Sequence, residues 1–319
     1  MNECKELFIS KNELTSLKNL LLKYGGEYTA TKIIYRYALY YNNTYIVTTS
    51  NKNKYITLVK SFLDELKSCG VEVGKEWKDN NKLPLKKGNK KLEKTTIILN
   101  VGSATFCPSK NTGKCNVCGI CYAANAERQY LNTLVYRLTQ TVRFYYLPAD
   151  EIAAQILRRT KTEYIRFNES GDVFDNKDIE KILQIAKICY KKKNLITYLY
   201  TAAGQQYKQY QTVYLKINIS GIDYTAVPNL TDANAKNNLV CCGVCNQCLY
   251  CKFEFGKQTV VKYHGAGIPD GTGRDNRSVG VKYYNTWHRL YCYNKYTQIK
   301  KEYKFNTYLI NAWDKNDNK

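Results

Sequence analysis

The chain has 319 residues, of which 44% are hydrophobic and 24% charged, so it is long enough for one large domain or two ordinary ones and is neither disordered as a whole nor collagen-like. Its thirteen cysteines stand against two histidines, His264 and His288, which excludes two-histidine zinc fingers and paired-histidine metalloprotease helices. No segment approaches the roughly 18 consecutive apolar residues of a membrane span, and residues 1–11 are polar and acidic. We therefore expect a cytoplasmic protein without membrane contact.

The formal net charge is +22, and the excess of basic residues is spread along the whole chain. Such an excess attracts polyanions through the release of condensed counterions, which makes nucleic acid a candidate partner. An AT-rich coding sequence also produces many Lys, Asn, Tyr and Ile residues without any selection for DNA binding. Both interpretations stay open, and the sequence does not indicate an oligomeric state.

Residues 1–74 are predicted to form a small basic α+β domain. Leucines within residues 14–22 have helical spacing, and β-rich runs within residues 31–49 flank a pair of asparagines that suits a tight hairpin turn. Apolar residues within 56–66 then predict a second amphipathic helix. Residues 75–94 are rich in lysine and poor in apolar residues, which predicts a basic linker or loop.

From residue 95 to residue 240 the sequence alternates between strand and helix patterns. We expect strands over about 96–101, 164–168, 195–201 and 214–219, and helices over about 123–146, 149–160 and 176–190. This alternation is typical of parallel βαβ units in an α/β fold, which place their functional loops at the carboxyl ends of the strands.

Nine of the thirteen cysteines lie in two groups. The first group is Cys107, Cys115, Cys118 and Cys121, and the second is Cys241, Cys242, Cys245, Cys248 and Cys251. Two intervening residues let neighbouring thiolates converge on one metal centre, and this spacing fits both an iron–sulfur cluster and a zinc site. A disulfide framework is disfavoured in a reducing compartment. The first group follows a core strand and precedes a long helix, which favours iron–sulfur and leaves zinc as the alternative.

A set of motifs within residues 95–265 resembles the phage gene product 88 family in order and spacing. The motifs are Cys107-Pro108, Cys118-Gly119-Ile120-Cys121-Tyr122-Ala123, Arg166, Ser170-Gly171-Asp172, Tyr200-Thr201, Cys242-x2-Cys245-x2-Cys248 and Tyr263-His264. The resemblance implies a phage or mobile-element protein. The layout is in turn similar to radical S-adenosylmethionine enzymes, in which three cysteines after the first barrel strand bind a [4Fe–4S] cluster.

This second similarity implies a role for each cysteine of the first group. Cys115, Cys118 and Cys121 would hold one cluster, although Lys114 stands where the usual C-x3-C-x2-C spacing needs a cysteine. Cys107 is then available as a fourth ligand. A fully ligated cluster would have no iron open to a cofactor, which would favour a structural or electron-storing centre.

The same similarity implies that an acidic glycine turn binds the methionine end of S-adenosylmethionine. Ser170, Gly171 and Asp172, together with Arg166, are the corresponding residues. A structural interpretation stays open beside this one, since Asp172 or Asp175 could cap the following helix and Arg166 could be a buried arginine paired with an acidic neighbour.

The fold expected from all of this is α/β, an incomplete parallel βα barrel over residues 95–240 with the small N-terminal domain, the linker at 75–94 and a Cys-rich C-terminal region at 241–319. We expect one or two [4Fe–4S] clusters, with zinc as the alternative. The expected metal ligands are Cys107, Cys115, Cys118, Cys121, Cys242, Cys245, Cys248 and Cys251. The function expected is a radical S-adenosylmethionine-like or redox enzyme acting on nucleic acid. The alternative is a non-catalytic iron–sulfur or zinc protein that binds nucleic acid.

Overall fold

The computed structural model describes residues 51–68, 81–88, 92, 94–111, 113–115, 121–227, 238–241, 250–253 and 258–262. The helix and hairpin expected before residue 50 lie outside the described residues. The same holds for Cys118, Cys242, Cys245 and Cys248, and for the chain after residue 262.

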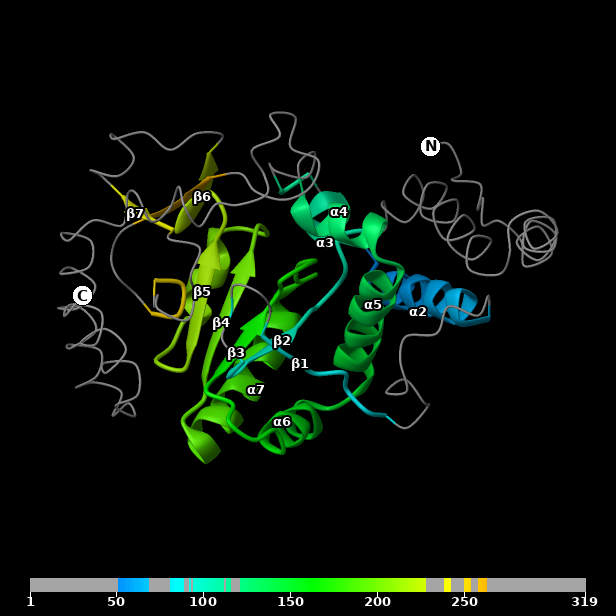
Figure 1. The fold of residues 1–319 in the computed structure, drawn as a ribbon, viewed down its shortest axis with the longest axis horizontal. Helices are drawn as coiled ribbons and strands as arrows, with labels where there is room; N and C mark the ends of the chain where they lie inside the picture. Colours follow the sequence, from blue (N-terminus) through cyan, green and yellow to red (C-terminus); the bar gives the residue numbers. More distant parts are fainter. Residues whose placement is uncertain are drawn as a thin grey trace, which may run out of the picture.

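A five-stranded sheet lies at the centre of the described structure (Figure 1). Its strands, in spatial order, are β1 (Lys86–Lys87), β2 (Thr96–Leu99), β3 (Tyr164–Phe167), β4 (Ile196–Thr201) and β5 (Leu215–Ile219). β1 pairs antiparallel with β2, and β2 to β5 pair in parallel. The expected α/β class with parallel strands is confirmed. The described strands form an open sheet with β1 and β5 at its edges, so closure toward a barrel stays a prediction.

Helices connect the parallel strands. They are α3 (Pro108–Asn111), α4 (Tyr122–Gln129), α5 (Leu131–Tyr146) and α6 (Ala149–Leu157) between β2 and β3, α7 (Asn176–Lys193) between β3 and β4, and the 3-10 helix η3 (Gln205–Tyr210) between β4 and β5. The single helix expected over 123–146 is two helices, because Tyr130 adopts an extended conformation with φ −122° and ψ 103°. Its amide still donates to the carbonyl of Ala126, so α4 ends with a satisfied backbone and the chain can turn.

The main core lies between the sheet and α6 and α7. Alternate strand residues point into it, since successive side chains of a strand face opposite sides. Those on the helix side are Ile97, Leu99, Ile165, Phe167, Leu199, Leu215, Ile217 and Ile219. Cys189 of α7 is fully buried in this core.

The opposite face of the sheet is unusually polar for parallel strands. Its residues include Tyr164, Arg166, Tyr198, Tyr200, Lys216 and Asn218. Parallel sheets covered on both faces normally carry apolar residues on both. Part of this polar face is covered by residues 250–253, since the Lys252 ammonium lies 3.9 Å from the centre of the Tyr164 ring. The end of the second cysteine group therefore lies against the polar face of the central sheet.

A second core joins α2 (Lys52–Ser68) to α5. Tyr55, Val59 and Phe62 of α2 are buried against Phe106 and Leu134. α2 includes the residues 56–66 for which a helix was predicted, and it packs beside α5 (Figure 1). It is therefore part of the same packed body as the sheet.

The segment expected as a basic linker at 75–94 contributes to the sheet in its described part. Lys86 and Lys87 form β1, while Leu83, Leu85 and Leu92 are buried. These leucines lie among lysines, and they attach the segment to the core.

A second, three-stranded parallel sheet crosses the boundary expected at residue 240. Its strands are β6 (Tyr224–Val227), β8 (Thr259–Lys262) and β7 (Leu239–Val240), in that spatial order. The Cys241 amide donates to the carbonyl of Val260. The central region and the start of the Cys-rich region are thus joined by backbone hydrogen bonds.

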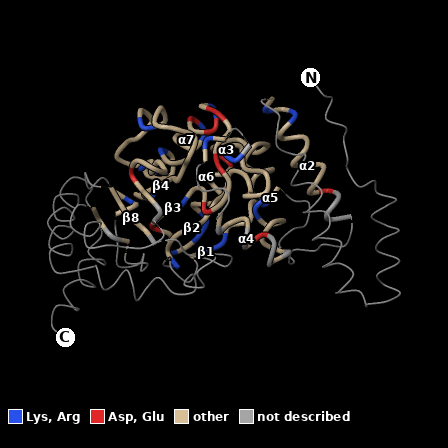
Figure 2. The backbone as a smooth tube through the Cα atoms, turned by 90° about the horizontal axis from the view of Figure 1, so that it is seen from above, with Lys and Arg blue, Asp and Glu red and all other residues tan. Residues whose placement is uncertain are grey.

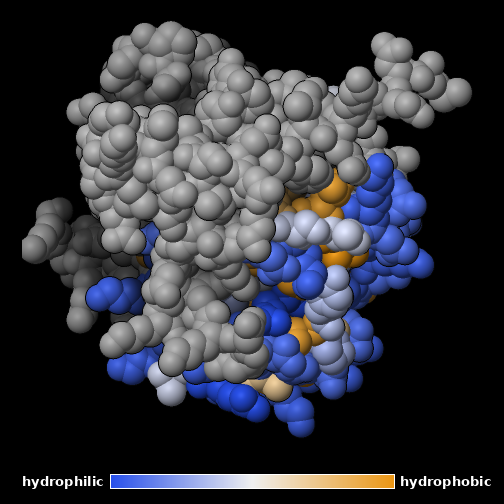
Figure 3. Space-filling model, turned by 90° about the vertical axis from the view of Figure 1, so that its right-hand side faces the viewer, coloured by the Kyte–Doolittle hydropathy of each residue, from blue (hydrophilic) through white to orange (hydrophobic). Residues whose placement is uncertain are grey.

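In the part of the chain that is described, no helix combines the length and apolar character needed to cross a bilayer. Lys and Arg residues occur on most described elements, with Asp and Glu between them (Figure 2). On the side where α2 lies, the described surface is mostly hydrophilic, with small apolar areas (Figure 3).

Candidate functional site

The loops that follow β2, β3 and β4 meet at the carboxyl edge of the central sheet. The Val101 amide donates to the Asn168 side chain over 3.0 Å, and the Ser170 amide donates to the Asn100 side chain over 2.8 Å. Gln140 of α5 accepts from the Asn100 side chain over 2.8 Å. The sequence predicted this edge as the functional one, and the structure shows that its loops are fixed by reciprocal hydrogen bonds.

Two glycines allow the β2 and β3 loops to touch backbone to backbone. Gly171 has a φ of +72°, and a Cβ atom added to it would lie 2.4 Å from the carbonyl carbon of Gly102. Gly102 itself has a φ of +98°. Since real Cβ atoms do not approach this closely, glycine at 171 is required by the packing of the two loops.

The carboxylate of Asp172 joins all three loops. It accepts hydrogen bonds from the Ser109 hydroxyl at 2.5 Å and from the amides of Val173 and Ala202, each at 2.8 Å. Burial raises the pKa of this carboxyl above its ordinary value, and hydrogen bonds from Ser109, Thr201 and the two amides oppose that rise. Asp172 therefore holds the three loops together through hydrogen bonds from Ser109, Val173 and Ala202.

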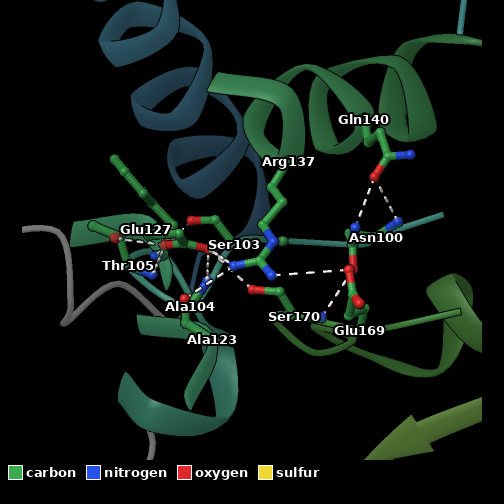
Figure 4. A network of polar contacts seen from close by, with 12 residues as sticks. Asn100, Ser103, Ala104, Thr105, Ala123, Glu127, Arg137, Gln140, Glu169 and Ser170 are labelled. Atoms are coloured by element: carbon green, nitrogen blue, oxygen red, sulfur yellow. Dashed lines mark hydrogen bonds and ion pairs between the residues drawn. The ribbon is translucent and has the colours of Figure 1, made fainter. Parts of the chain in front are cut away.

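Glu127 of α4 is a buried acceptor that the sequence reasoning missed (Figure 4). It accepts from the Ala104 amide at 2.8 Å, from the Thr105 amide at 2.9 Å and from the Thr105 hydroxyl at 2.7 Å. The Ser170 hydroxyl donates to it over 3.0 Å. One carboxylate thus fixes the start of the cysteine loop and ties it to the turn after β3.

Arg137 of α5 balances the charge of Glu127. Its guanidinium donates to the Glu127 carboxylate over 2.9 Å and to the Ala123 carbonyl over 3.0 Å, and the pair is almost fully buried. A further contact of 3.9 Å reaches the Glu169 carboxylate. No short motif joins these residues in the sequence, so only the fold reveals the pair.

The first cysteine group begins in this loop. The short helix α3 turns the chain, and the amides of Lys114 and Cys115 both donate to the Ser109 carbonyl, at 2.9 and 3.2 Å. This turn brings Cys115 back toward Cys107. Burial raises the pKa of the Cys107 thiol well above its ordinary value, and the neighbouring charges of Asp172 and Cys115 raise it further.

Cys121 is the residue that precedes α4, and it is half-buried like Cys107 and Cys115. Cys118 lies outside the described residues. Among the residues that are described, no three His, Cys, Asp or Glu side chains form a group that could hold a metal ion. In the described part of the chain, Cys107 and Cys115 therefore lie before and after the turn of α3, and Cys121 lies at the start of the next helix.

The second cysteine group is described only at its ends. Cys241 follows β7 and Cys251 lies against the polar face of the central sheet, and both are half-buried and outside any disulfide. The Asn218 side chain donates to the Cys251 carbonyl over 2.8 Å. The other expected ligands, Cys242, Cys245 and Cys248, lie outside the described residues.

The remaining expected site residues have structural contacts. Arg166 stacks its guanidinium 4.9 Å from the centre of the Tyr200 ring on the polar face. Asp175 is the N-cap of α7, where its carboxylate accepts from the Asp178 amide, which confirms the capping interpretation for this residue. Lys52 of α2 also binds Asp175 and Asp178, at 2.8 and 2.6 Å, and so ties α2 to α7.

Comparison with known families gives one result. Residues 75–220 match the family model described as gene product 88, which covers β1 to β5 and the first cysteine group. This match supports the resemblance to the phage gene product 88 family noted from the motifs. No curated protein and no solved structure matches the chain.

Proposed function

We propose that this chain is a phage iron–sulfur protein that holds a [4Fe–4S] cluster on its first cysteine group, at the carboxyl edge of the central sheet. The observation that carries the proposal is the turn of α3 in the loop after β2, which folds the chain back so that the Cys115 amide donates to the carbonyl of Ser109, two residues after Cys107. Cys118 and Cys121 follow at the two-residue spacing typical of cluster ligands.

The protein residues around this loop would keep the ligands in place. Glu127 fixes the backbone of Ala104 and Thr105, just before Cys107, and Asp172 holds Ser109, just after it. Because both carboxylates are buried and bonded to several donors, the loop is pre-organised. When bound, a reduced cluster supplies one electron.

A finer proposal is that the chain is a radical S-adenosylmethionine-like or redox enzyme on an incomplete βα barrel. It is supported by the sequential order of parallel β2 to β5 and by their polar face, which is unusual for a parallel sheet covered on both sides. Ser170, Gly171 and Arg166 lie on or beside this edge and would contact the cofactor. Asp172 would act there through the loops that it joins.

The test of the cluster is purification under anaerobic conditions with iron supplied. We expect a brown protein with absorbance at about 400 nm from thiolate-to-iron charge transfer, and iron in excess of zinc. The triple variant Cys115→Ala, Cys118→Ala and Cys121→Ala should lose iron, whereas Cys189→Ala, in the core between α7 and the sheet, should keep it. Zinc without iron in the parent, or full iron in the triple variant, would contradict the proposal.

The enzyme proposal has its own assay. Reduced protein is incubated with S-adenosylmethionine, and reductive cleavage to 5′-deoxyadenosine is followed by chromatography. Cleavage that requires the first cysteine group supports the radical chemistry. If the protein contains the cluster but does not cleave S-adenosylmethionine, the radical chemistry is refuted and the cluster is a redox or structural centre.

Nucleic acid is the partner proposed on the strength of the net charge of +22. Its test is a filter-binding titration at several salt concentrations, since the logarithm of affinity falls with the logarithm of salt by about 0.9 per phosphate contact on duplex. Replacing the dense lysine run Lys86, Lys87, Lys90, Lys91 and Lys94 by Gln should reduce both affinity and slope. The matched control changes the same number of exposed lysines to Gln on α7, namely Lys177, Lys187, Lys191, Lys192 and Lys193. Equal behaviour of both variants would show that the run is not a binding site.

A further inference from the structure

The first turn of α2 reaches into the loop that carries Cys107. The Tyr55 hydroxyl donates a hydrogen bond to the carbonyl of Phe106 over 2.7 Å, and Phe106 is the residue directly before Cys107. The same hydroxyl oxygen lies 3.4 Å from the position that a Cβ atom on Gly102 would take. Tyr55 is 1% exposed, so its polar end is buried inside the loop after β2. A helix outside this loop therefore supplies a buried donor to it.

The same turn of α2 is also tied to the next loop of the candidate site. The Lys52 ammonium binds the carboxylates of Asp175 and Asp178, at 2.8 and 2.6 Å. Lys52 and Tyr55 are three residues apart, which puts them on the same face of the helix. One turn of α2 thus joins the loop after β2 to the start of α7, which follows the turn after β3.

The ring of Tyr55 is fixed by aromatic neighbours on both of these sides. Its centroid lies 5.3 Å from that of Phe174, just before α7, and 6.2 Å from that of Tyr145 in an edge-to-face contact. The ring of Phe106 packs in turn on Phe62 of α2, with centroids 5.0 Å apart. Contacts of this kind restrain the plane of a ring, so the direction of the Tyr55 hydroxyl is set by the protein itself.

The Phe106 carbonyl is the point at which α2 holds the cysteine loop. The preceding amides, those of Ala104 and Thr105, are held from α4 by the carboxylate of Glu127. The bond from α2 acts one residue before Cys107, where the backbone determines the direction of the thiol. A ligand side chain is held in a fixed geometry by the hydrogen bonds of the residues that support it.

We propose that Tyr55 is a positioning residue for Cys107, in which the first turn of α2 fixes the Phe106 carbonyl and so holds the Cys107 thiol in place. The ligand role of Cys107 rests on the iron–sulfur function proposed above. α2 precedes the residues 75–220 that match the gene product 88 family. The loop that starts the first cysteine group is therefore completed by a residue from outside the matched region.

The first experiment is hydrogen–deuterium exchange of the full-length chain, followed by mass spectrometry of its peptides. The amides of the loop after β2 donate to buried acceptors on α4 and α5, so they exchange only when the loop opens. We expect peptides over residues 101–107 to exchange about 5-fold to 100-fold faster in Tyr55→Phe, since a lost buried hydrogen bond shifts a local opening equilibrium by about that factor. Peptides from β4 should exchange as in the parent.

The second experiment measures the thiol itself. The parent and Tyr55→Phe are treated with a chelator, alkylated with iodoacetamide and digested, and the rate of modification is followed at each cysteine by mass spectrometry. Cys107 is half-buried in the parent and should be modified faster in Tyr55→Phe. Cys189 is buried in the core between the sheet and α7, so its modification reports global unfolding and should stay unchanged. Iron is determined in the same preparations before the chelator is added.

Tyr145→Phe is the matched control for both experiments. It removes a hydroxyl from the same aromatic cluster, but this hydroxyl donates to the Asp178 carboxylate over 2.9 Å and lies outside the cysteine loop. Loop exchange and Cys107 modification in Tyr145→Phe should equal those of the parent. A difference between the two variants then belongs to the bond with Phe106.

The outcomes separate this inference from the iron–sulfur proposal. Faster loop exchange and faster Cys107 modification in Tyr55→Phe support the positioning role, and the absence of iron from the parent would then refute the iron assignment alone. Unchanged exchange and modification overturn the role even if the protein contains iron. The role requires both changes, so either one alone overturns it. Equal acceleration in β4, at Cys189 or in Tyr145→Phe overturns it too, because the effect would be a general loss of stability.

Discussion

Replacing Gly171 by Ala should strongly destabilise the protein, because the added methyl group has no space. The new Cβ atom would lie 2.4 Å from the Gly102 carbonyl carbon and 2.6 Å from its oxygen, whereas ordinary contacts begin at 3.4 Å. The loops must therefore separate by about 1 Å. The left-handed conformation costs an alanine about 1–2 kcal/mol, and overpacking of a fixed site costs about 1–3 kcal/mol more. We expect a total loss of about 2–5 kcal/mol in the free energy of unfolding.

Gly113→Ala is the matched control for this variant. Gly113 has a φ of +67°, close to that of Gly171, but a Cβ atom there would meet nothing within 4 Å. The free energy of unfolding of Gly113→Ala should therefore fall only by the cost of the left-handed conformation, about 1–2 kcal/mol. The assay is urea unfolding followed by circular dichroism, with equal m-values for the two variants. Equal losses in both variants would refute the argument from close backbone approach.

Three further predictions follow from buried groups elsewhere in the fold. Glu127→Gln should lose about 3–5 kcal/mol in urea unfolding, because it removes the closer of the two charged partners of buried Arg137. Asp64→Asn on the exposed side of α2 should change stability by about 0.5 kcal/mol or less. Burial raises the pKa of Asp178 in the folded protein above its ordinary value of 3.8, so stability from this group falls as pH rises above that value. Lys52 opposes that rise in pKa. Lys52→Met should therefore lose stability more steeply than the parent as pH rises above 3.8, and parallel pH profiles would contradict this. Burial raises the pKa of Cys189 to about 12, so iodoacetamide at pH 8 should not modify it until the protein unfolds, as peptide mass spectrometry can show.

The strands and their order could be predicted from the sequence because each parallel strand is a short run rich in aliphatic and aromatic residues. The runs that begin near Thr96, Tyr164, Leu195 and Tyr214 all became strands within two residues of the expected bounds. The break between α4 and α5 was missed, since Tyr130 is neither glycine nor proline and no local signal marks it. The role of Leu83 and its neighbours was also missed, because a few leucines among lysines have no periodicity.

The candidate site was predictable in position but not in its internal contacts. Parallel strands place their carboxyl ends together, so the loops of Cys107 and Asp172 had to meet. Glu127 could not be found in this way. Its partners Thr105 and Ser170 lie tens of residues away in the chain, and only packing determines such pairs.

The position of Asp172 also limits how the sequence can change over time. Its single carboxylate accepts from Ser109 before α3 is complete and from Ala202 after β4 ends, while the residue itself belongs to the turn after β3. An insertion or deletion in one of these three loops would displace a donor or the acceptor that the others depend on. Related sequences should therefore keep the lengths of these three loops constant together, or change them only in concert.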